Sequence, residues 1–109
     1  MTDLQATAAQ YRREAHRDYA RSRADAKRAA YWYQAARGTE TTARWLSGRP
    51  DMWEEDFTPA TVGARARCWR QVADIFLRGS FRAMESARFH NDLAASYDEM
   101  SARYARDWL

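Results

Sequence analysis

The sequence is poor in residues that break helices and in residues that favour strands. Only four Gly and two Pro occur among 109 residues, so the turns that a multi-stranded sheet needs are scarce. Leu, Ile and Val together supply eight residues, and Val and Ile, which favour strands, account for only three of them. Ala, the strongest helix former, occurs 22 times. These absences exclude a β-rich fold and predict an all-α protein.

Cysteine and long apolar runs are also scarce, which bears on the cellular compartment. Cys68 is the single cysteine, so no internal disulfide can form, as is usual in a reducing cytoplasm. No run approaches the roughly 20 apolar residues that cross a bilayer. Asp3 and Gln5 stand where a signal peptide would carry a basic region and an apolar run. We therefore expect a cytoplasmic protein with no membrane partner.

A first long helix is predicted over residues 3–37. This segment contains no Gly or Pro, Thr2 or Asp3 can cap its start, and Gly38 stands where a left-handed residue would end it. Small and aromatic residues recur along one face at steps of three and four: Leu4, Ala8, Tyr11, Ala15, Tyr19, Ser22, Ala26, Ala29, Tyr33 and Ala36. Because most of these residues are Ala, a second helix can approach this face closely.

A last long helix is predicted over residues 59–108. Thr58 can act as its N-cap, and Pro59 suits the first helical position. An uninterrupted heptad stripe follows: Val62, Ala66, Trp69, Ala73, Phe76, Ser80, Ala83, Ala87, His90, Ala94, Tyr97, Ser101, Tyr104 and Trp108. This stripe predicts either one continuous helix or two nearly collinear helices broken near residue 79.

Residues 39–58 are predicted to join the long helices through a short helix and an acidic–aromatic connector. The short helix would run from Thr39 to Leu46, before Ser47–Gly48–Arg49–Pro50 breaks the chain. The connector residues singled out are Trp53, Glu54, Glu55 and Phe57. Two interpretations stay open: the aromatic residues pin a plain loop to the core, or the four residues form an exposed protein-binding motif.

These segments predict a single helical domain over residues 1–109, built as a bundle of two long helices and a short intervening one. The last helix carries a second line of apolar residues beside its heptad stripe: Val72, Ile75, Phe89, Leu93 and Met100. One partner helix cannot cover so much apolar surface. Either the last helix folds back near Gly79 or a second copy of the chain completes the bundle, and we expect a homodimer.

The sequence contains no pattern typical of catalysis or metal binding. His16 and His90 are far apart, and neither has a carboxylate or Cys at metal-ligand spacing. His90 lies on the heptad stripe and is expected to be a hydrogen-bonded interface histidine, while Cys68 is expected to be a packed thiol. The four Gly residues are scattered, so no phosphate-binding loop is expected. We predict a non-enzymatic protein with no catalytic residues, metal or cofactor.

Arginine beside aromatic residues on the last helix suggests a protein-binding surface. Arg and large aromatics are the residues typical of protein–protein hot spots. Together with the connector, the predicted protein-binding residues include Arg78, Phe81, Arg82 and Arg88. We expect an adaptor, an assembly subunit or a small inhibitor of the kind found in phages and mobile elements, which occludes a larger complex. The sequence leaves the partner's identity open.

Nucleic-acid binding is the alternative function. The sequence pI is about 9.3, 17 of the 18 basic residues are Arg, and one face of the first helix presents Arg13, Arg17, Arg21 and Arg28. The net charge is only +3, however, and acidic residues on the same helix stand at salt-bridge spacing from these arginines. A solvated helix face is therefore the favoured interpretation of these four residues.

The segment Trp45–Leu46–Ser47–Gly48, lying between two long helical regions, resembles the turn of the small helical-hairpin proteins exported by type VII secretion. The resemblance implies a helical hairpin with tryptophan and glycine at its turn. Those proteins carry Trp-x-Gly and a C-terminal Tyr-x-x-x-Asp/Glu signal, whereas this chain has Trp-x-x-Gly, and Tyr104 is followed by Asp107 at a spacing of three. Both motifs differ by one residue, so the chain is not assigned to that family.

Overall fold

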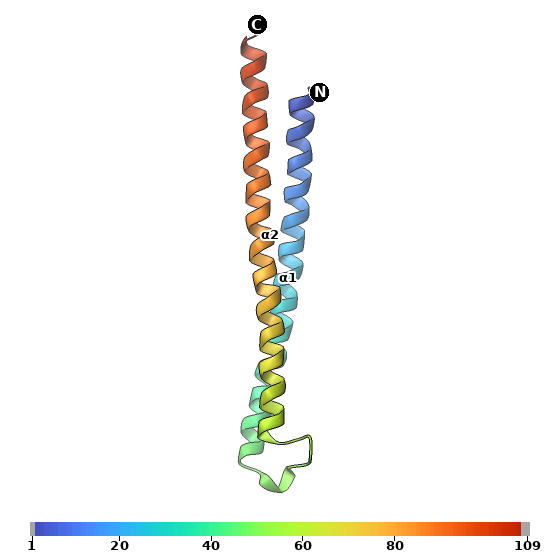
Figure 1. Cartoon of the computed structure of the whole chain (residues 1–109), viewed down its shortest axis with the longest axis vertical. Helices are drawn as coiled ribbons and strands as arrows, with labels where there is room; N and C mark the ends of the chain where they lie inside the picture. Colours follow the sequence, from blue (N-terminus) through green and yellow to red (C-terminus); the bar gives the residue numbers. More distant parts are fainter. Residues whose placement is uncertain (1, 108–109) are drawn as a thin grey trace. The chain divides into compact units, whose positions relative to one another are not determined.

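The computed structural model describes residues 2–107 and contains two long helices joined by a connector (Figure 1). Helix α1 spans Asp3–Ser47, the 3-10 turn η1 spans Pro50–Met52, and helix α2 spans Pro59–Asp107. Within the described range no strand occurs, and the residues Glu54 and Phe57 form only an isolated bridge. The predicted all-α fold with two long helices is therefore confirmed.

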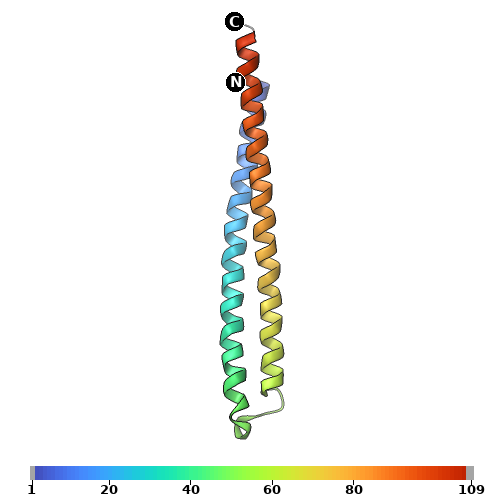
Figure 2. The same cartoon turned by 90° about the vertical axis from the view of Figure 1, so that its left-hand side faces the viewer.

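The chain forms two compact units, and each unit contains a segment of both helices. The first unit combines the chain up to Ala24 with the chain from Gly79 onward, and the second unit comprises Asp25–Arg78. Within each unit the two helical segments run antiparallel, as Figure 1 shows for the first unit and Figure 2 for the second. The second unit is thus a helical hairpin closed by the connector.

Small residues fill the seam between the helices in both units. On α1 the buried residues recur every seven positions: Ala8, Ala15, Ser22, Ala29 and Ala36. On α2 a second series has the same spacing: Ala66, Ala73, Ser80, Ala87 and Ala94. Leu46 is the largest side chain that is fully buried. Because a methyl group is the bulkiest apolar group at most of these positions, the helix backbones can approach closely, as the two stripes predict.

A buried pair of serines aligns the two helices in the first unit. The Ser80 hydroxyl donates to the Ser22 carbonyl oxygen at 2.9 Å, and the two hydroxyl oxygens lie 3.0 Å apart. One heptad away from this pair in opposite directions, Ala15 comes opposite Ala87. In each of the two seven-residue series of buried residues, the serine is the middle member and the other four members are alanines.

Both helices begin with reciprocal side-chain caps. At α1 the Gln5 amide donates to Thr2 Oγ1 at 3.2 Å, and the Thr2 amide donates to Gln5 Oε1 at 3.0 Å. At α2 the residues Thr58 and Thr61 form the same pair of bonds, at 3.2 and 3.0 Å. Each pair satisfies two amides that have no partner inside the helix. The predicted starts at Thr2 and Thr58 are correct.

The predicted end of the first helix at residue 37 is wrong. Helix α1 continues through Gly38 to Ser47, so the short helix predicted over Thr39–Leu46 is part of α1, and the connector predicted over residues 39–58 begins only at Gly48. No described glycine has the positive φ of a left-handed cap. Burial of Ala36 and Leu46 on either side of Gly38 outweighs the roughly 1 kcal/mol that glycine costs inside a helix.

Helix α2 is unbroken at Gly79, so of the two predicted alternatives the continuous helix is the one observed. Next to Gly79, Ser80 is hydrogen-bonded to Ser22, and the buried alanines of α2 keep their seven-residue spacing. Trp108, the last residue of the predicted stripe, lies outside the described residues. Among the helices that are described, none combines the length and the apolar character needed to cross a membrane.

Candidate protein-binding surfaces

Many of the large apolar side chains lie on the surface. The fully buried seam positions are mostly Ala and Ser, where protein interiors normally take bulkier residues, and ring pairs such as Tyr11–Tyr97 and Trp32–Trp69 are half-buried between the helices. The exposed large side chains are Tyr31, Trp45, Met52, Trp53, Phe57, Ile75, Phe81, Phe89, Met100 and Tyr104. Exposed apolar residues that cluster mark interaction sites. The surfaces that combine them with charge are therefore the candidate binding surfaces.

The connector is anchored to the end of α1 by one tryptophan. The Trp53 indole N–H donates to the Leu46 carbonyl oxygen at 2.6 Å, which satisfies an acceptor that the end of the helix leaves free. The guanidinium of Arg49 lies over the Trp45 ring, 5.3 Å from its centroid. Trp53 is nonetheless 45% exposed. It holds the connector against α1 and still shows much of its surface to solvent.

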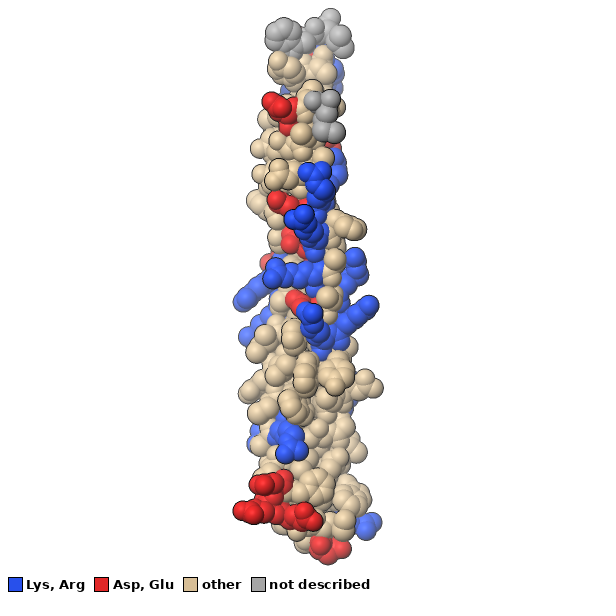
Figure 3. Space-filling model, turned by 90° about the vertical axis from the view of Figure 1, so that its right-hand side faces the viewer, with Lys and Arg blue, Asp and Glu red and all other residues tan. Residues whose placement is uncertain are grey.

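A tight turn in the connector displays the acidic residues. Glu54 and Phe57 exchange two backbone hydrogen bonds, of 3.0 and 3.3 Å, which places Glu55 and Asp56 at the tip. The carboxylates of the turn are exposed, and none forms an ion pair with any described residue. Acidic side chains gather at this end of the face shown in Figure 3. Phe57 is 38% exposed, so an aromatic ring borders a patch of negative charge.

The four predicted binding residues of the last helix all lie on the exposed surface of α2. Arg78, Phe81 and Arg88 share one side of the helix by their spacing, while Arg82 lies about 100° away from Phe81. Within the described part of the chain, none of the three arginines forms an ion pair. Phe81 is 61% exposed. An exposed ring flanked by unpaired guanidinium groups is available for contact.

In the first unit, His90 of α2 joins two carboxylates of α1. Its Nε2 lies 3.2 Å from Glu14 Oε2, and its Nδ1 lies 3.0 Å from Asp18 Oδ2. The Ser86 hydroxyl donates to the same Asp18 oxygen at 2.7 Å. The Ser86 hydrogen bond, supported by His90, outweighs burial and holds the pKa of Asp18 below its usual range. His90 is the hydrogen-bonded interface histidine that the heptad stripe predicts.

The geometry of this cluster suits neither nucleophilic catalysis nor metal binding. A serine triad places the serine and the acid at opposite nitrogens of the imidazole, whereas Ser86 and Asp18 both approach His90 Nδ1. The two carboxylates lie at opposite ring nitrogens, so they do not converge on one point. Across residues 2–107, no group of three or more His, Cys, Asp or Glu side chains could hold a metal ion. The cluster instead fastens α1 to α2.

The arginine face of α1 keeps less internal pairing than its spacing suggests. Among the predicted pairs within the helix, only Asp25 and Arg28 are in contact, at 3.1 Å. Glu14 and Asp18 turn toward His90, so Arg13, Arg17 and Arg21 form no ion pair with a described residue. These three guanidinium groups are exposed and can meet an anionic partner.

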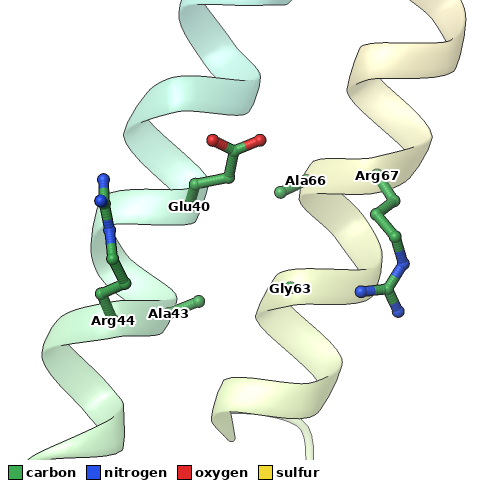
Figure 4. A pocket seen from close by; sticks show the side chains of 6 residues that line it. All are labelled: Glu40, Ala43, Arg44, Gly63, Ala66 and Arg67. Atoms are coloured by element: carbon green, nitrogen blue, oxygen red, sulfur yellow. The ribbon is translucent and has the colours of Figure 1, made fainter.

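A groove between the helices of the second unit offers no site for a small molecule. Its lining consists of Glu40, Ala43, Arg44, Gly63, Ala66 and Arg67. Both arginine side chains point away from the groove (Figure 4). The remaining carboxylate, Glu40, is paired with Arg70 at 2.6 Å. Ligand sites need polar groups that converge, and this groove presents methyl groups and one neutralised acid.

The prediction of a packed thiol at Cys68 is wrong, because this side chain is exposed. Cys68 precedes Trp69 of the predicted stripe by one position, which turns it about 100° from the seam. The stripe therefore already indicated that Cys68 lies outside the seam.

Comparison of this chain with protein families, curated proteins and solved structures finds no match. The candidate surfaces consequently rest on geometry alone. Sequence reasoning assigned Trp45 to a separate short helix and missed it as an exposed ring at the end of α1. Phe89, on the second apolar line of α2, is also exposed.

Proposed function

We propose that this protein is a non-enzymatic protein-binding module. The observation that carries the proposal is the distribution of apolar side chains: alanines and serines occupy most of the buried seam positions, while ten large side chains are exposed. Leaving so many large apolar side chains in water forgoes the free energy that their burial would contribute, about 25 cal/mol per Å². A partner protein that covers part of them recovers that free energy.

Two surfaces combine exposed aromatic rings with charged side chains. The connector combines Trp53 and Phe57 with exposed carboxylates, which suits a partner surface that is basic around an apolar patch. The outer face of α2 combines Phe81 with Arg88, which suits an apolar pocket with an acidic rim. In hot spots of this kind a few aromatic and arginine residues supply most of the binding free energy.

The roles that fit such a module are an adaptor, an assembly subunit or a small inhibitor of a larger complex. A cytoplasmic location is part of the proposal and is supported by the single, unpaired Cys68, because proteins of oxidising compartments more often carry disulfides.

The test begins with affinity capture on the immobilised full chain and continues with the purified partner. We expect Phe81→Ala to raise the partner's Kd at least about tenfold, as removal of a hot-spot ring does. The matched control, Arg13→Ala/Arg17→Ala/Arg21→Ala, should leave Kd within about twofold because these residues lie on α1. Titration calorimetry measures both. Capture that nuclease treatment abolishes, or a loss confined to the α1 variant, would contradict the proposal.

Nucleic-acid binding is a second candidate, favoured by Arg13, Arg17 and Arg21, which form no ion pair among residues 2–107. If each contacts a phosphate, the triple alanine variant lowers the slope of log K against log salt by up to about three. Fluorescence anisotropy with a mixed-sequence duplex between 50 and 200 mM salt, a range over which such slopes are measured, gives this slope. A slope that is unchanged in the variant would remove the α1 face as a nucleic-acid site.

A further inference from the structure

We propose that a second copy of this chain packs antiparallel against a second heptad seam of α2. This second seam is defined by alternating steps of four and three: Cys68, Val72, Ile75, Gly79, Arg82, Ser86, Phe89, Leu93, Ser96 and Met100. The proposal goes beyond the proposed function, because it concerns self-association and uses a different side of α2 from Phe81 and Arg88. Its success or failure leaves the search for a foreign partner unaffected.

The second seam has the position that a further helix would occupy. Every one of its residues precedes a residue of the first stripe by one position, so the two seams lie about 100° apart around α2. The first seam is covered by α1, whereas Ile75, Phe89 and Met100 of the second are 64, 61 and 49% exposed. A helix with two adjoining apolar seams is typical of bundles with more than two helices.

Side-chain sizes along the second seam match those of its own reversed copy. With a two-fold axis beside residue 84, Phe89 of one copy meets Gly79 of the other, which has no side chain to displace. By the same register Leu93 meets Ile75, Met100 meets Cys68, and Arg82 meets Ser86 next to the axis. The outer layers thus pair a large residue with a small or medium one, as knobs-into-holes packing requires, while the two layers next to the axis are polar. The occupant of such a self-complementary face is a second copy in an isologous dimer.

Charge favours the antiparallel orientation over the parallel one. In this register Arg82 of each copy lies opposite Ser86 of the other, one position from Glu85, so its guanidinium can reach that carboxylate near the axis. Neither Arg82 nor Glu85 forms an ion pair among the residues that the structure describes. A parallel, in-register pair would instead place Arg82 against Arg82, and apposed like charges are unfavourable.

The decisive measurement is the oligomeric state of the full chain by light scattering after size exclusion, at several protein concentrations. We expect a dimer, and we expect Phe89→Lys to raise its Kd at least about 30-fold because a charge replaces a central apolar contact. Phe81→Lys is the matched control, since Phe81 has the same exposure, 61%, on the same helix. It should remain dimeric, and circular dichroism should show equal helicity in both variants.

Charge reversal tests the register. Arg82→Glu places acidic groups of both copies together at the axis and should weaken the dimer at least about fivefold, while Arg82→Glu/Glu85→Arg should restore it. Arg82 and Glu85 are also i, i+3 neighbours within α2, so equal helicity of the two variants is needed to assign a restored dimer to contact between copies. A double variant that dimerises no better than the single one would overturn the register.

Orientation is measured on the native sequence, because Cys68 is its single cysteine and is exposed. The antiparallel register separates the two Cys68 positions by 32 residues along the helices, which corresponds to about 48 Å. Double electron–electron resonance between spin labels on Cys68 should give a distance near this value. A short distance would show a parallel dimer, and a monomer at every concentration would assign the second seam to another partner; either result would overturn the proposal.

Discussion

At the scale of single residues, the acidic side chains of α1 differ in whether their partner lies on α2 or on α1 itself. Glu14 and Asp18 contact His90, and Asp18 also accepts from Ser86. Asp25 stays with Arg28 of its own helix. The neighbouring arginines of α1 are left in solvent as a consequence. A change at Asp18 therefore acts on the packing of the first unit and on the charge of its surface.

Asp18 should make stability depend on pH in the acid range. Its pKa is lower in the folded protein, through the Ser86 hydrogen bond first, than in the unfolded chain, where aspartate titrates at about 3.9. The stability it contributes is present above the unfolded value and is lost as pH falls through the folded pKa. We expect Asp18→Asn to lower the free energy of unfolding at pH 7 by about 1–2 kcal/mol.

Urea denaturation between pH 7 and pH 2 measures this effect. The Asn variant should lose less stability than the native protein over the acid part of the range, because residue 18 no longer binds a proton there. Asp92→Asn is the control, since the Asp92 side chain is exposed and has no ion pair within residues 2–107. If the free energy of unfolding falls with pH equally in the native protein and in the Asp18 variant, the role assigned to this carboxylate is refuted.

At the scale of the elements, the end of α1 is decided by packing. The helix passes an exposed glycine and three threonines before it ends at Ser47. The threonine hydroxyls donate to carbonyl oxygens four residues earlier, at 2.8–3.1 Å. The buried Leu46 then anchors the last turn, and the Trp53 indole N–H donates a hydrogen bond to the Leu46 carbonyl oxygen. The final turns of α1 thus depend on contacts with the connector and with α2.

Gly38→Ala should stabilise the protein by about 0.5–1 kcal/mol. A Cβ at this position meets nothing within 4 Å, and the backbone is helical without positive φ. Alanine therefore adds helix propensity and reduces the entropy of the unfolded chain without strain. Thermal unfolding measures the gain, with Gly48→Ala, which lies beyond the end of α1, as the control that lacks a helical position. A lower thermal stability of Gly38→Ala than of the native protein would indicate that α1 ends near Gly38 in solution.

At the scale of the whole molecule, most buried positions of the seams hold small residues, and ten large apolar side chains are exposed. Alanine opposite alanine permits close packing but specifies register weakly, because a shift by one heptad would pair alanine with alanine again. The Ser22–Ser80 pair interrupts that repetition. A buried polar pair is the device by which coiled coils select one register.

The two serines should respond unequally to truncation. In Ser22→Ala the Ser80 hydroxyl keeps its bond to the carbonyl oxygen of residue 22, so the loss of stability should be under about 0.5 kcal/mol. In Ser80→Ala the buried Ser22 hydroxyl loses its partner across the seam, which costs about 1 kcal/mol. Urea denaturation of both single variants and the double variant gives the coupling free energy. Equal losses in the single variants would contradict this hydrogen-bond arrangement.

Helical content, the two long helices, their starts at Thr2 and Thr58, and the alanine seams could be predicted from the sequence. These features depend on local chemistry and on spacing: caps act within one turn, and residues seven apart share a helix face. For the same reason the sequence indicated that α2 carries more apolar surface than α1 can cover. The residues named for protein binding remain predictions, since no contact within one chain tests them.

Only the tertiary structure decided that α1 continues through Gly38 and that Glu14 and Asp18 turn from the arginines to His90. Each outcome depends on a partner far away in sequence, here the opposing helix or the connector. Local propensities of a few tenths of a kcal/mol per residue yield to burial and to cross-seam hydrogen bonds of about 1 kcal/mol or more. Such contacts exist only once the two helices have met.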